Sequence, residues 1–199
     1  MNQKEVTKHF NKIAQDYDRY KQKNSFYYSS IKRGLSNKIP SKSNVIDFGC
    51  GTGEILAYLS PKHGIGFDPS PEMIHIAKEK FAKNTRLQFT SSEKSISMPR
   101  IDFIVMVDVI EHLPHPEETF KKVADLMGKN TILLVSFVSP TWEPILSILE
   151  KIQFKMPEGP HARLTTEEVI RFATNASLSL KLKEILFPFP ITLLQFSKN

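Results

Sequence analysis

The ten residues 45–54, Val-Ile-Asp-Phe-Gly-Cys-Gly-Thr-Gly-Glu, decide the fold of this chain. An apolar run leads directly into Gly49, Gly51 and Gly53, and a segment with helical spacing follows. A strand that turns sharply into a helix places its loop at the carboxyl end of a parallel sheet, where open α/β sheets bind ligands. The glycines let the backbone approach a ligand where a Cβ would collide. The stretch therefore predicts a ligand-binding loop.

An acidic residue follows the next apolar run. Asp68 comes directly after Gly64–Phe67 and fifteen residues after Gly53. A carboxylate at this position can accept hydrogen bonds from both hydroxyls of a ribose. In the dinucleotide fingerprint the third glycine comes about three residues after the second, whereas Gly51 and Gly53 are two apart. The two features together indicate a nucleoside cofactor, and the glycine spacing disfavours a nicotinamide dehydrogenase.

Apolar runs and segments of helical period alternate along the rest of the chain, which is typical of βαβ units. We expect strands at Val45–Phe48, Gly64–Phe67, Arg86–Thr90, Ile101–Val107 and Thr131–Val138, and helices at Glu54–Leu59, Pro71–Phe81 and Glu117–Met127. Two later helices, over 142–152 and from Thr166, precede two strands at Leu178–Phe187 and Ile191–Ser197. Prolines between these last strands favour a tight reversal. The pattern predicts a mostly parallel sheet that ends in an antiparallel hairpin.

The composition is that of a soluble globular protein. The 199 residues are 40% hydrophobic and 24% charged, which disfavours a disordered or fibrous chain and fits one domain. The longest apolar stretch, Ile132 to Val138, is too short to span a membrane. The first residues carry no secretory signal, so we expect a cytoplasmic protein. A single cysteine, Cys50, allows no internal disulfide.

The positive charge is concentrated at the N-terminus. The chain carries a net charge of +6, and residues 1–43 hold ten Lys or Arg against three Asp or Glu. From residue 44 onward the balance is 17 against 18. The same N-terminal segment places Phe10, Ile13, Ala14 and Tyr17 on one helical face. We therefore expect a basic amphipathic helix at the edge of the domain.

Three further motifs extend the pattern to most of the chain. They are residues 10–18 (Phe-Asn-Lys-Ile-Ala-Gln-Asp-Tyr-Asp), residues 101–113, which contain the expected fourth strand and the turn after it, and residues 161–168 (His-Ala-Arg-Leu-Thr-Thr-Glu-Glu). With the glycine loop and Asp68, they resemble the class I S-adenosylmethionine-dependent methyltransferases of the methyltransferase type 11, or UbiE-like, group. The resemblance implies an α/β fold: a Rossmann-like, seven-stranded, mostly parallel sheet with helices on both faces and an antiparallel C-terminal hairpin.

The resemblance also implies a domain organisation and a set of cofactor residues. Residues 1–199 would form one methyltransferase domain, with a basic N-terminal helical cap (1–43), a cofactor-binding half (44–138), and acceptor-side helices with the C-terminal hairpin (139–199). The cofactor implied is S-adenosyl-L-methionine, which becomes S-adenosyl-L-homocysteine. The residues assigned to it are Tyr17, Asp47, Gly49, Cys50, Gly51, Gly53, Asp68, Pro69, Met73, Ser92, Glu93, Asp108 and Val109.

Individual roles follow from the same resemblance. Tyr17 would lie near the methionine end of the cofactor, Asp68 would bind its ribose, and Met73 would cover its adenine. After the third strand the group commonly has an acid that meets the adenine amine. Here the sequence is Thr-Ser-Ser-Glu at 90–93, so Ser92 or Glu93 would take that role.

Catalysis of methyl transfer requires alignment of donor and acceptor and, for a hydroxyl acceptor, removal of its proton. Imidazole titrates near neutrality, so we expect His112 and His161 as catalytic residues with Glu111 beside them, and His115 is a further candidate base. A structural role is the alternative for each histidine. We expect no metal, although Asp108, Glu111 and His112 resemble the E-x-x-E-H cation site of some O-methyltransferases.

The expected function is O-methylation of a small molecule by in-line methyl transfer. The Asp-Val-Ile-Glu sequence at 108–111 lacks the Asn/Asp-Pro-Pro-aromatic motif of nucleobase amine methyltransferases. The basic N-terminal segment also fits an RNA or protein methyltransferase. A regulator that binds the cofactor without turnover is a third reading. The sequence does not identify the methyl acceptor or the oligomeric state.

Overall fold

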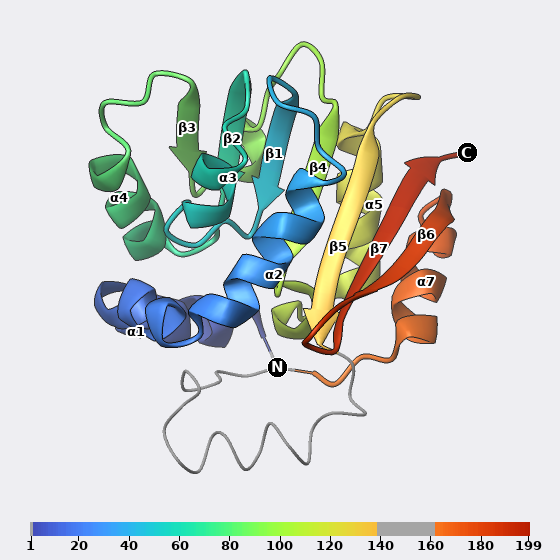
Figure 1. The fold of residues 1–199 in the computed structure, drawn as a ribbon, viewed down its shortest axis with the longest axis horizontal. Coiled ribbons are helices and arrows are strands. Elements are labelled where there is room, and N and C mark those ends of the chain that lie inside the picture. The colour runs from blue at the N-terminus through green and yellow to red at the C-terminus, as the bar shows by residue number, and fades with distance from the viewer. Residues whose placement is uncertain (1, 139–161) are drawn as a thin grey trace.

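The computed structural model describes residues 2–138 and 162–199 (Figure 1). Seven strands form one sheet in the order β3-β2-β1-β4-β5-β7-β6. β1 to β5 are parallel, and β7 runs antiparallel to both β5 and β6. The strands are β1 (Asn44–Phe48), β2 (His63–Phe67), β3 (Leu87–Thr90), β4 (Phe103–Val107), β5 (Ile132–Val138), β6 (Leu178–Leu186) and β7 (Ile191–Lys198). The predicted α/β sheet and its antiparallel C-terminal hairpin are confirmed.

Helices cover both faces of the sheet. α2, α3 and α4 pack on one face and α5 and α7 on the other, and each face has its own cluster of buried apolar side chains. Short 3₁₀ turns, η1 and η2, follow β3 and β4. The bounds are α1 (Gln3–Lys23), α2 (Ser25–Ser36), α3 (Glu54–Tyr58), α4 (Pro71–Lys80), η1 (Glu93–Ser95), η2 (Ile110–His112), α5 (Pro116–Leu126) and α7 (Thr166–Asn175). The helix predicted over 142–152 lies outside the described residues.

α1 lies across the carboxyl ends of the parallel strands (Figure 1). Its first turn is closed by a capping box between Asn2 and Glu5, which satisfies backbone donors that a helix start leaves free. Val6 and Ala14 are its only buried side chains. Phe10, Ile13 and Tyr17 on its predicted apolar face are partly buried, and Asn11 and Asp18 add hydrogen bonds to Ser70 and Thr52.

α2 was not predicted from the sequence. It begins after Asn24 and packs against the β6–β7 hairpin, with Gly34 next to Leu186 and the ring of Tyr27 5.8 Å from that of Phe189. Ile31 of α2 is fully buried. The N-terminal segment is thus two helices rather than one. No helix in the described ranges is both long and apolar enough to cross a membrane.

Candidate functional site

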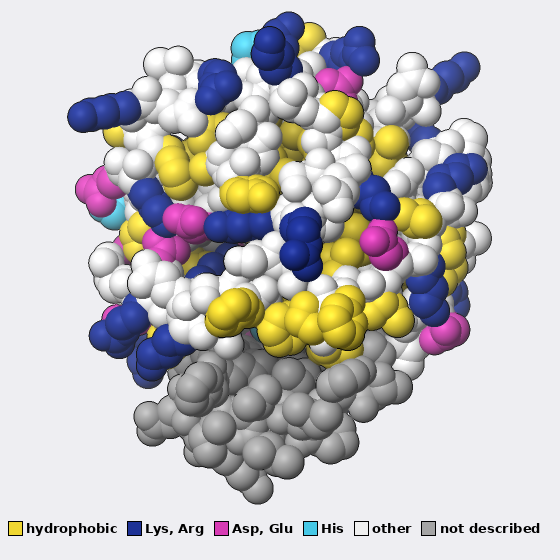
Figure 2. Space-filling view, viewed as in Figure 1, with side chains coloured by type: hydrophobic (Ala, Val, Ile, Leu, Met, Phe, Trp, Pro, Cys, Tyr) yellow, Lys and Arg dark blue, Asp and Glu magenta, His cyan; other side chains and the backbone are white. Residues whose placement is uncertain are grey.

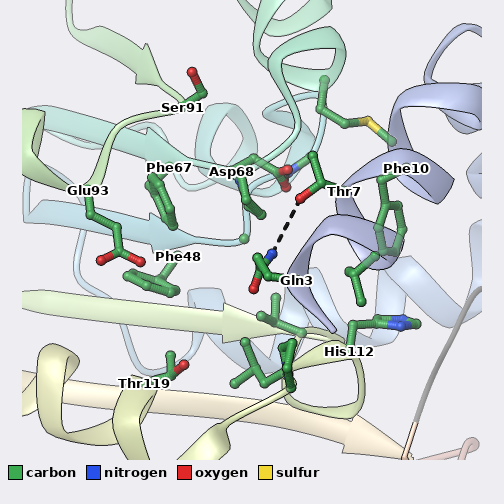
Figure 3. A pocket seen from close by; sticks show the side chains of 18 of the residues that line it. Gln3, Thr7, Phe10, Phe48, Phe67, Asp68, Ser91, Glu93, His112 and Thr119 are labelled. Carbon is green, nitrogen blue, oxygen red and sulfur yellow. Dashed lines mark hydrogen bonds between the residues drawn. The ribbon is translucent and has the colours of Figure 1, made fainter. Parts of the chain in front are cut away.

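A cavity of about 620 Å³ opens at the carboxyl ends of β1, β2 and β4, beneath α1 (Figure 3). This size is ordinary for a small-molecule site. Figure 3 shows Phe67 and Asp68 of the sheet side opposite Thr7 and Phe10 of α1. Most of the residues predicted to bind a cofactor or to act in catalysis line this cavity: Tyr17, Gly49, Gly51, Asp68, Pro69, Met73, Ser92, Glu93, Asp108, Val109 and His112.

The glycine loop follows β1 and is held by the neighbouring strand. The backbone N–H groups of Gly49 and Cys50 both donate to the Phe67 carbonyl, at 2.7 and 2.9 Å. Gly49 has a φ of +87°, and a Cβ on it would lie 2.3 Å from a methyl carbon of Val109. Any side chain at this position would be strained and would collide. The loop therefore leaves a cradle in which a ligand can touch the backbone.

Asp68 is fixed by two backbone donors. Its carboxylate accepts hydrogen bonds from the amides of Gly51 and Ser70, each at 2.9 Å. Burial raises the pKa of Asp68 to about 6, although the two amides oppose the shift. A carboxylate has about four acceptor sites, so two more hydrogen bonds can be accepted from a ligand in the cavity. A pair of ribose hydroxyls matches this capacity.

Three predicted cofactor residues lie behind the cavity wall rather than on it. Asp47 is 1% exposed, and burial raises its pKa to about 7 while the charge of Lys21 and the Leu56 amide oppose that shift. Burial also raises the pKa of the Cys50 thiol well above its usual range, so Cys50 is an uncharged small residue of the loop. Gly53 is the N-cap of α3. Their contribution is to shape the loop.

Lys21, which contacts the cavity-lining Tyr17, is a residue that sequence analysis missed. Its Nζ lies 4.8 Å from the ring centre of Tyr17 and 4.6 Å from that of Tyr28. Burial lowers its pKa, but Tyr17, Asp108 and Asp47 outweigh burial and raise the pKa above the ordinary value. Lys21 is therefore a charged ammonium between the Tyr17 and Tyr28 rings. The signal was available, because Lys21 follows Tyr17 at helical spacing on the same face of α1.

That ammonium suits an anionic ligand group. No ion pair among the described residues includes Lys21, and its partners are aromatic rings and the Tyr17 hydroxyl. The Asp108 and Asp47 carboxylates also act on this ammonium and raise its pKa. Lys21 is not among the residues that line the cavity, but the Tyr17 ring that it contacts is. A ligand carboxylate that reaches Tyr17 would therefore add to the negative charge that already faces the ammonium.

Asp108 and His112 occupy the far end of the cavity. Asp108 follows β4 with a φ of +52°, and its carboxylate accepts a 2.8 Å hydrogen bond from the Tyr27 hydroxyl. Burial is the main cause that raises the pKa of Tyr27 well above its usual range, and the negative charge of Asp108 is the second cause. The His112 ring meets Phe10 edge-to-face at 5.1 Å, and Figure 3 shows the two side by side. An imidazole, a carboxylate and aromatic rings therefore lie together at this end of the cavity.

The hypothetical cation site is not assembled. Across residues 2–138 and 162–199, no three His, Cys, Asp or Glu side chains come together in a group that could hold a metal ion. Asp108 instead contacts Tyr27, and Glu111 is not among the residues that line the cavity. The Glu111 carbonyl accepts the Ala162 amide at 2.6 Å. His161 lies outside the described residues.

Three further predicted residues line the opposite end of the cavity. Glu93 lies in η1 and forms an ion pair with Lys122 of α5 at 2.9 Å. Ser92 precedes it and is the N-cap of that 3₁₀ turn. Met73 is fully buried in α4 and contributes to the cavity wall. These groups offer an apolar surface and polar edges to a flat ring.

The sequence matches a known protein family over most of its length. Residues 17–176 match the family model described as a methyltransferase domain. The chain is 27% identical over 129 residues to a ubiquinone biosynthesis O-methyltransferase of Coxiella burnetii, covering 59% of this chain and 54% of that protein. It is 26% identical over 134 residues to an uncharacterized protein of Methanocaldococcus jannaschii, covering 65% and 60%. The chain thus spans about half the length of the curated relatives it matches.

Solved structures share the fold. Magnesium protoporphyrin IX methyltransferase from Synechocystis, with bound S-adenosylhomocysteine, superposes with a TM-score of 0.72 at 18% identity and full coverage of both chains (100% and 100%). An S-adenosylmethionine-dependent methyltransferase from Thermotoga maritima gives 0.72 at 19% identity, covering 98% and 100%. These likenesses establish the Rossmann-like architecture, and the matched family model establishes the lineage. The chain belongs to the methyltransferase-domain family, the class I S-adenosylmethionine-dependent methyltransferases.

Proposed function

We propose that this protein transfers a methyl group from S-adenosylmethionine to a hydroxyl oxygen of a small molecule. The observation that carries the proposal is the position of His112, which lines the same cavity as Asp68 and the glycine loop. Imidazole can take a proton near neutral pH. A hydroxyl acceptor needs such a base, whereas a basic amine can attack once it is unprotonated.

The residues present fit the cofactor. When bound, S-adenosylmethionine supplies a methyl group on a positively charged sulfur. Asp68 would accept the ribose hydroxyls, and Lys21 would bind the carboxylate of the amino-acid end. Met73 and Pro69 would pack against the adenine, with Ser92 and Glu93 at its polar edge. The contribution of the protein is to hold the cofactor in one orientation and so to reduce the entropy lost on reaction.

The acceptor would lie between Asp108, His112 and Phe10. The His112 imidazole would accept the proton of the acceptor hydroxyl as the oxygen–methyl bond forms. The edge-to-face contact with Phe10 at 5.1 Å restricts how that ring can turn, and aromatic pairs of this kind are stabilising. The likeness to a ubiquinone biosynthesis O-methyltransferase supports an oxygen acceptor. The volume of the cavity, about 620 Å³, supports a small molecule.

The test compares His112→Gln with a matched control. The purified protein is incubated with S-adenosylmethionine and separate pools of phenols, catechols, carboxylic acids and amines, and methylated products are identified by mass spectrometry. We expect a methyl ether, and a loss of about 10²–10⁴ in kcat for His112→Gln with an unchanged dissociation constant for S-adenosylhomocysteine. His75→Gln, on the outer side of α4 with the side chain 61% exposed, should keep the wild-type rate. N-methylated products, or full activity of His112→Gln, would refute the proposal.

A further inference from the structure

A second cavity lies at the other end of the sheet. It has a volume of about 450 Å³ and is formed by the starts of β1, β2 and β3 and the segment that leads into β4. Its lining residues are polar or basic for the most part: Asn44, Lys62, His63, Gly64, Ile65, Thr85, Arg86, Gln88, Ser97, Met98, Pro99 and Arg100. We call it the amino-end hollow. Nothing in the proposed methyl transfer uses these residues.

The charge of the amino-end hollow is positive. Lys62, Arg86, Arg100 and His63 line it, and none of its lining residues is acidic. The Asp102 carboxylate contacts two of the lining residues: it accepts the Asn44 amide at 2.8 Å and pairs with Nε of Arg100 at 2.7 Å. Arg100 is thus partly neutralised, although its other nitrogens are left for a ligand. Asp102 also holds the base of the hollow in place.

Lys62 and Arg86 carry the uncompensated charge. Within the described part of the chain, neither forms an ion pair. The backbones of both are fixed by strand pairing, because the Lys62 amide donates to the Ser43 carbonyl and the Arg86 carbonyl accepts from Gly64. The two residues directly precede the neighbouring strands β2 and β3. Both are exposed, so an anion that enters the hollow can reach their side chains.

The surroundings of the hollow have the same sign. Lys42 precedes β1, Lys83 precedes β3 and Lys129 precedes β5, and all three are exposed. Figure 2 shows Lys and Arg side chains along the upper edge of the molecule, which is the amino-end edge of the parallel strands in Figure 1. The molecule therefore has a second basic region at this edge, in addition to the basic segment 1–43. An anion would be attracted to this edge before it meets the hollow.

We propose that the amino-end hollow binds a phosphate group. Arginine presents a planar set of donors that matches phosphate oxygens, and lysine adds a point charge. The Thr85 and Ser97 hydroxyls on the same lining can donate further hydrogen bonds. The phosphate belongs either to a small phosphorylated molecule or to the backbone of a nucleic acid, since both offer the same chemistry.

The site is separate from the methyl-transfer cavity. β1 and β2 are five residues long, so the two cavities are about 16 Å apart along the strands. A phosphate in the hollow cannot touch the cofactor or the methyl acceptor. It would act as an anchor for a ligand or as an effector, and not as a substrate group at the reaction centre.

Titration calorimetry with two probes tests the proposal and identifies the source of the phosphate. The probes are inorganic pyrophosphate and a short oligouridylate, each at low and at moderate salt. We expect saturable binding that weakens at least tenfold in Lys62→Gln/Arg86→Gln. Lys121→Gln/Lys181→Gln removes the same charge from exposed positions elsewhere and should bind like the wild type. Tighter binding of the oligouridylate with a steep loss in salt would indicate a nucleic acid, and binding of pyrophosphate alone would indicate a small ligand.

Other outcomes would overturn the proposal. They are the absence of saturable binding by both probes, an equal loss in the control variant, and displacement of pyrophosphate by S-adenosylhomocysteine, which would place the anion in the cofactor cavity. S-adenosylhomocysteine should bind Lys62→Gln/Arg86→Gln with wild-type affinity, and this verifies that the variant is folded. Because the readout is anion binding, failure here leaves the methyltransferase proposal untouched.

Discussion

The two sides of the cofactor cavity are built in different ways. On the sheet side, backbone hydrogen bonds hold Gly49 and Asp68 to neighbouring residues. On the side of α1 and α2, side chains make the attachment: Asn11 accepts from the Ser70 hydroxyl and Asp18 from the Thr52 hydroxyl, both at 2.6 Å. The difference shows that the sheet fixes the geometry of the site in advance, whereas the two helices bring charge and aromatic groups to it.

Substitution of the first glycine should give the largest effect on the sheet side. Gly49→Ala places a Cβ 2.3 Å from Val109 at a φ of +87°, and strain with overpacking costs about 3 kcal/mol or more. We expect this loss in the free energy of unfolding by denaturant, with loss of S-adenosylhomocysteine binding by more than about a hundredfold. Gly128→Ala, whose Cβ would come no closer than 3.7 Å to Thr131, should be neutral. A stable Gly49→Ala variant that binds normally would show that the loop is not pre-formed.

Removal of the Asp68 carboxylate should have the second largest effect on ligand binding. Asp68→Ala should weaken binding by about 1.5–3 kcal/mol, because charge-assisted hydrogen bonds are lost. Calorimetry should show the same loss for S-adenosylhomocysteine and for 5′-methylthioadenosine, since both contain the ribose. Asp125→Ala, at an exposed position in α5, is the control. An unchanged affinity for either ligand would contradict the assignment of Asp68.

A substitution on the helical side should discriminate between the same two ligands. Lys21→Met should weaken S-adenosylhomocysteine about tenfold, the order expected for one charge-assisted contact. It should leave 5′-methylthioadenosine unchanged, because that ligand has no carboxylate. Lys23→Met, two residues further along α1 and exposed, should affect neither. An equal loss for both ligands would mean that Lys21 acts by supporting the fold.

The smallest expected effect is that of pH. The pKa of Asp68 is raised by burial to about 6, and ribose hydroxyls bind the carboxylate form. Protonation therefore competes with the ligand, so affinity should be constant above pH 7 and should fall by about twofold at pH 6. Calorimetry between pH 8 and pH 6 should show this fall in the wild type and in Asp47→Asn, and no fall in Asp68→Ala. A wild-type affinity that rises towards pH 6 would contradict the prediction that the Asp68 carboxylate binds the ligand.

The sheet side could be predicted from sequence because its information is local. The strand, the glycine loop and Asp68 lie within 25 residues of one another, and each has a residue type that its backbone position requires. The antiparallel hairpin was equally readable, since its prolines separate two apolar runs. The cofactor and the family followed from the same short motifs.

The helical side could not be predicted in the same way. Tyr27 and Asp108 are 81 positions apart, and no local pattern states that they meet. Asp108 leaves β4 in the left-handed region and accepts from Tyr27, and among the described residues no three His, Cys, Asp or Glu side chains form a group that could hold a metal ion. Spacing along the chain placed Asp108, Glu111 and His112 close together, but only the three-dimensional path of the backbone decides which way side chains point.

The buried charges around the glycine loop have a consequence for turnover. Asp47, Asp68 and Asp108 all act on the single ammonium of Lys21 or are stabilised by it, so carboxylates outnumber cations here. The methyl donor carries a positive sulfur, and the spent cofactor does not. The negative charge around the glycine loop therefore favours S-adenosylmethionine over S-adenosylhomocysteine. We expect S-adenosylhomocysteine to inhibit less strongly than it would if only the contacts that the two ligands have in common decided its affinity.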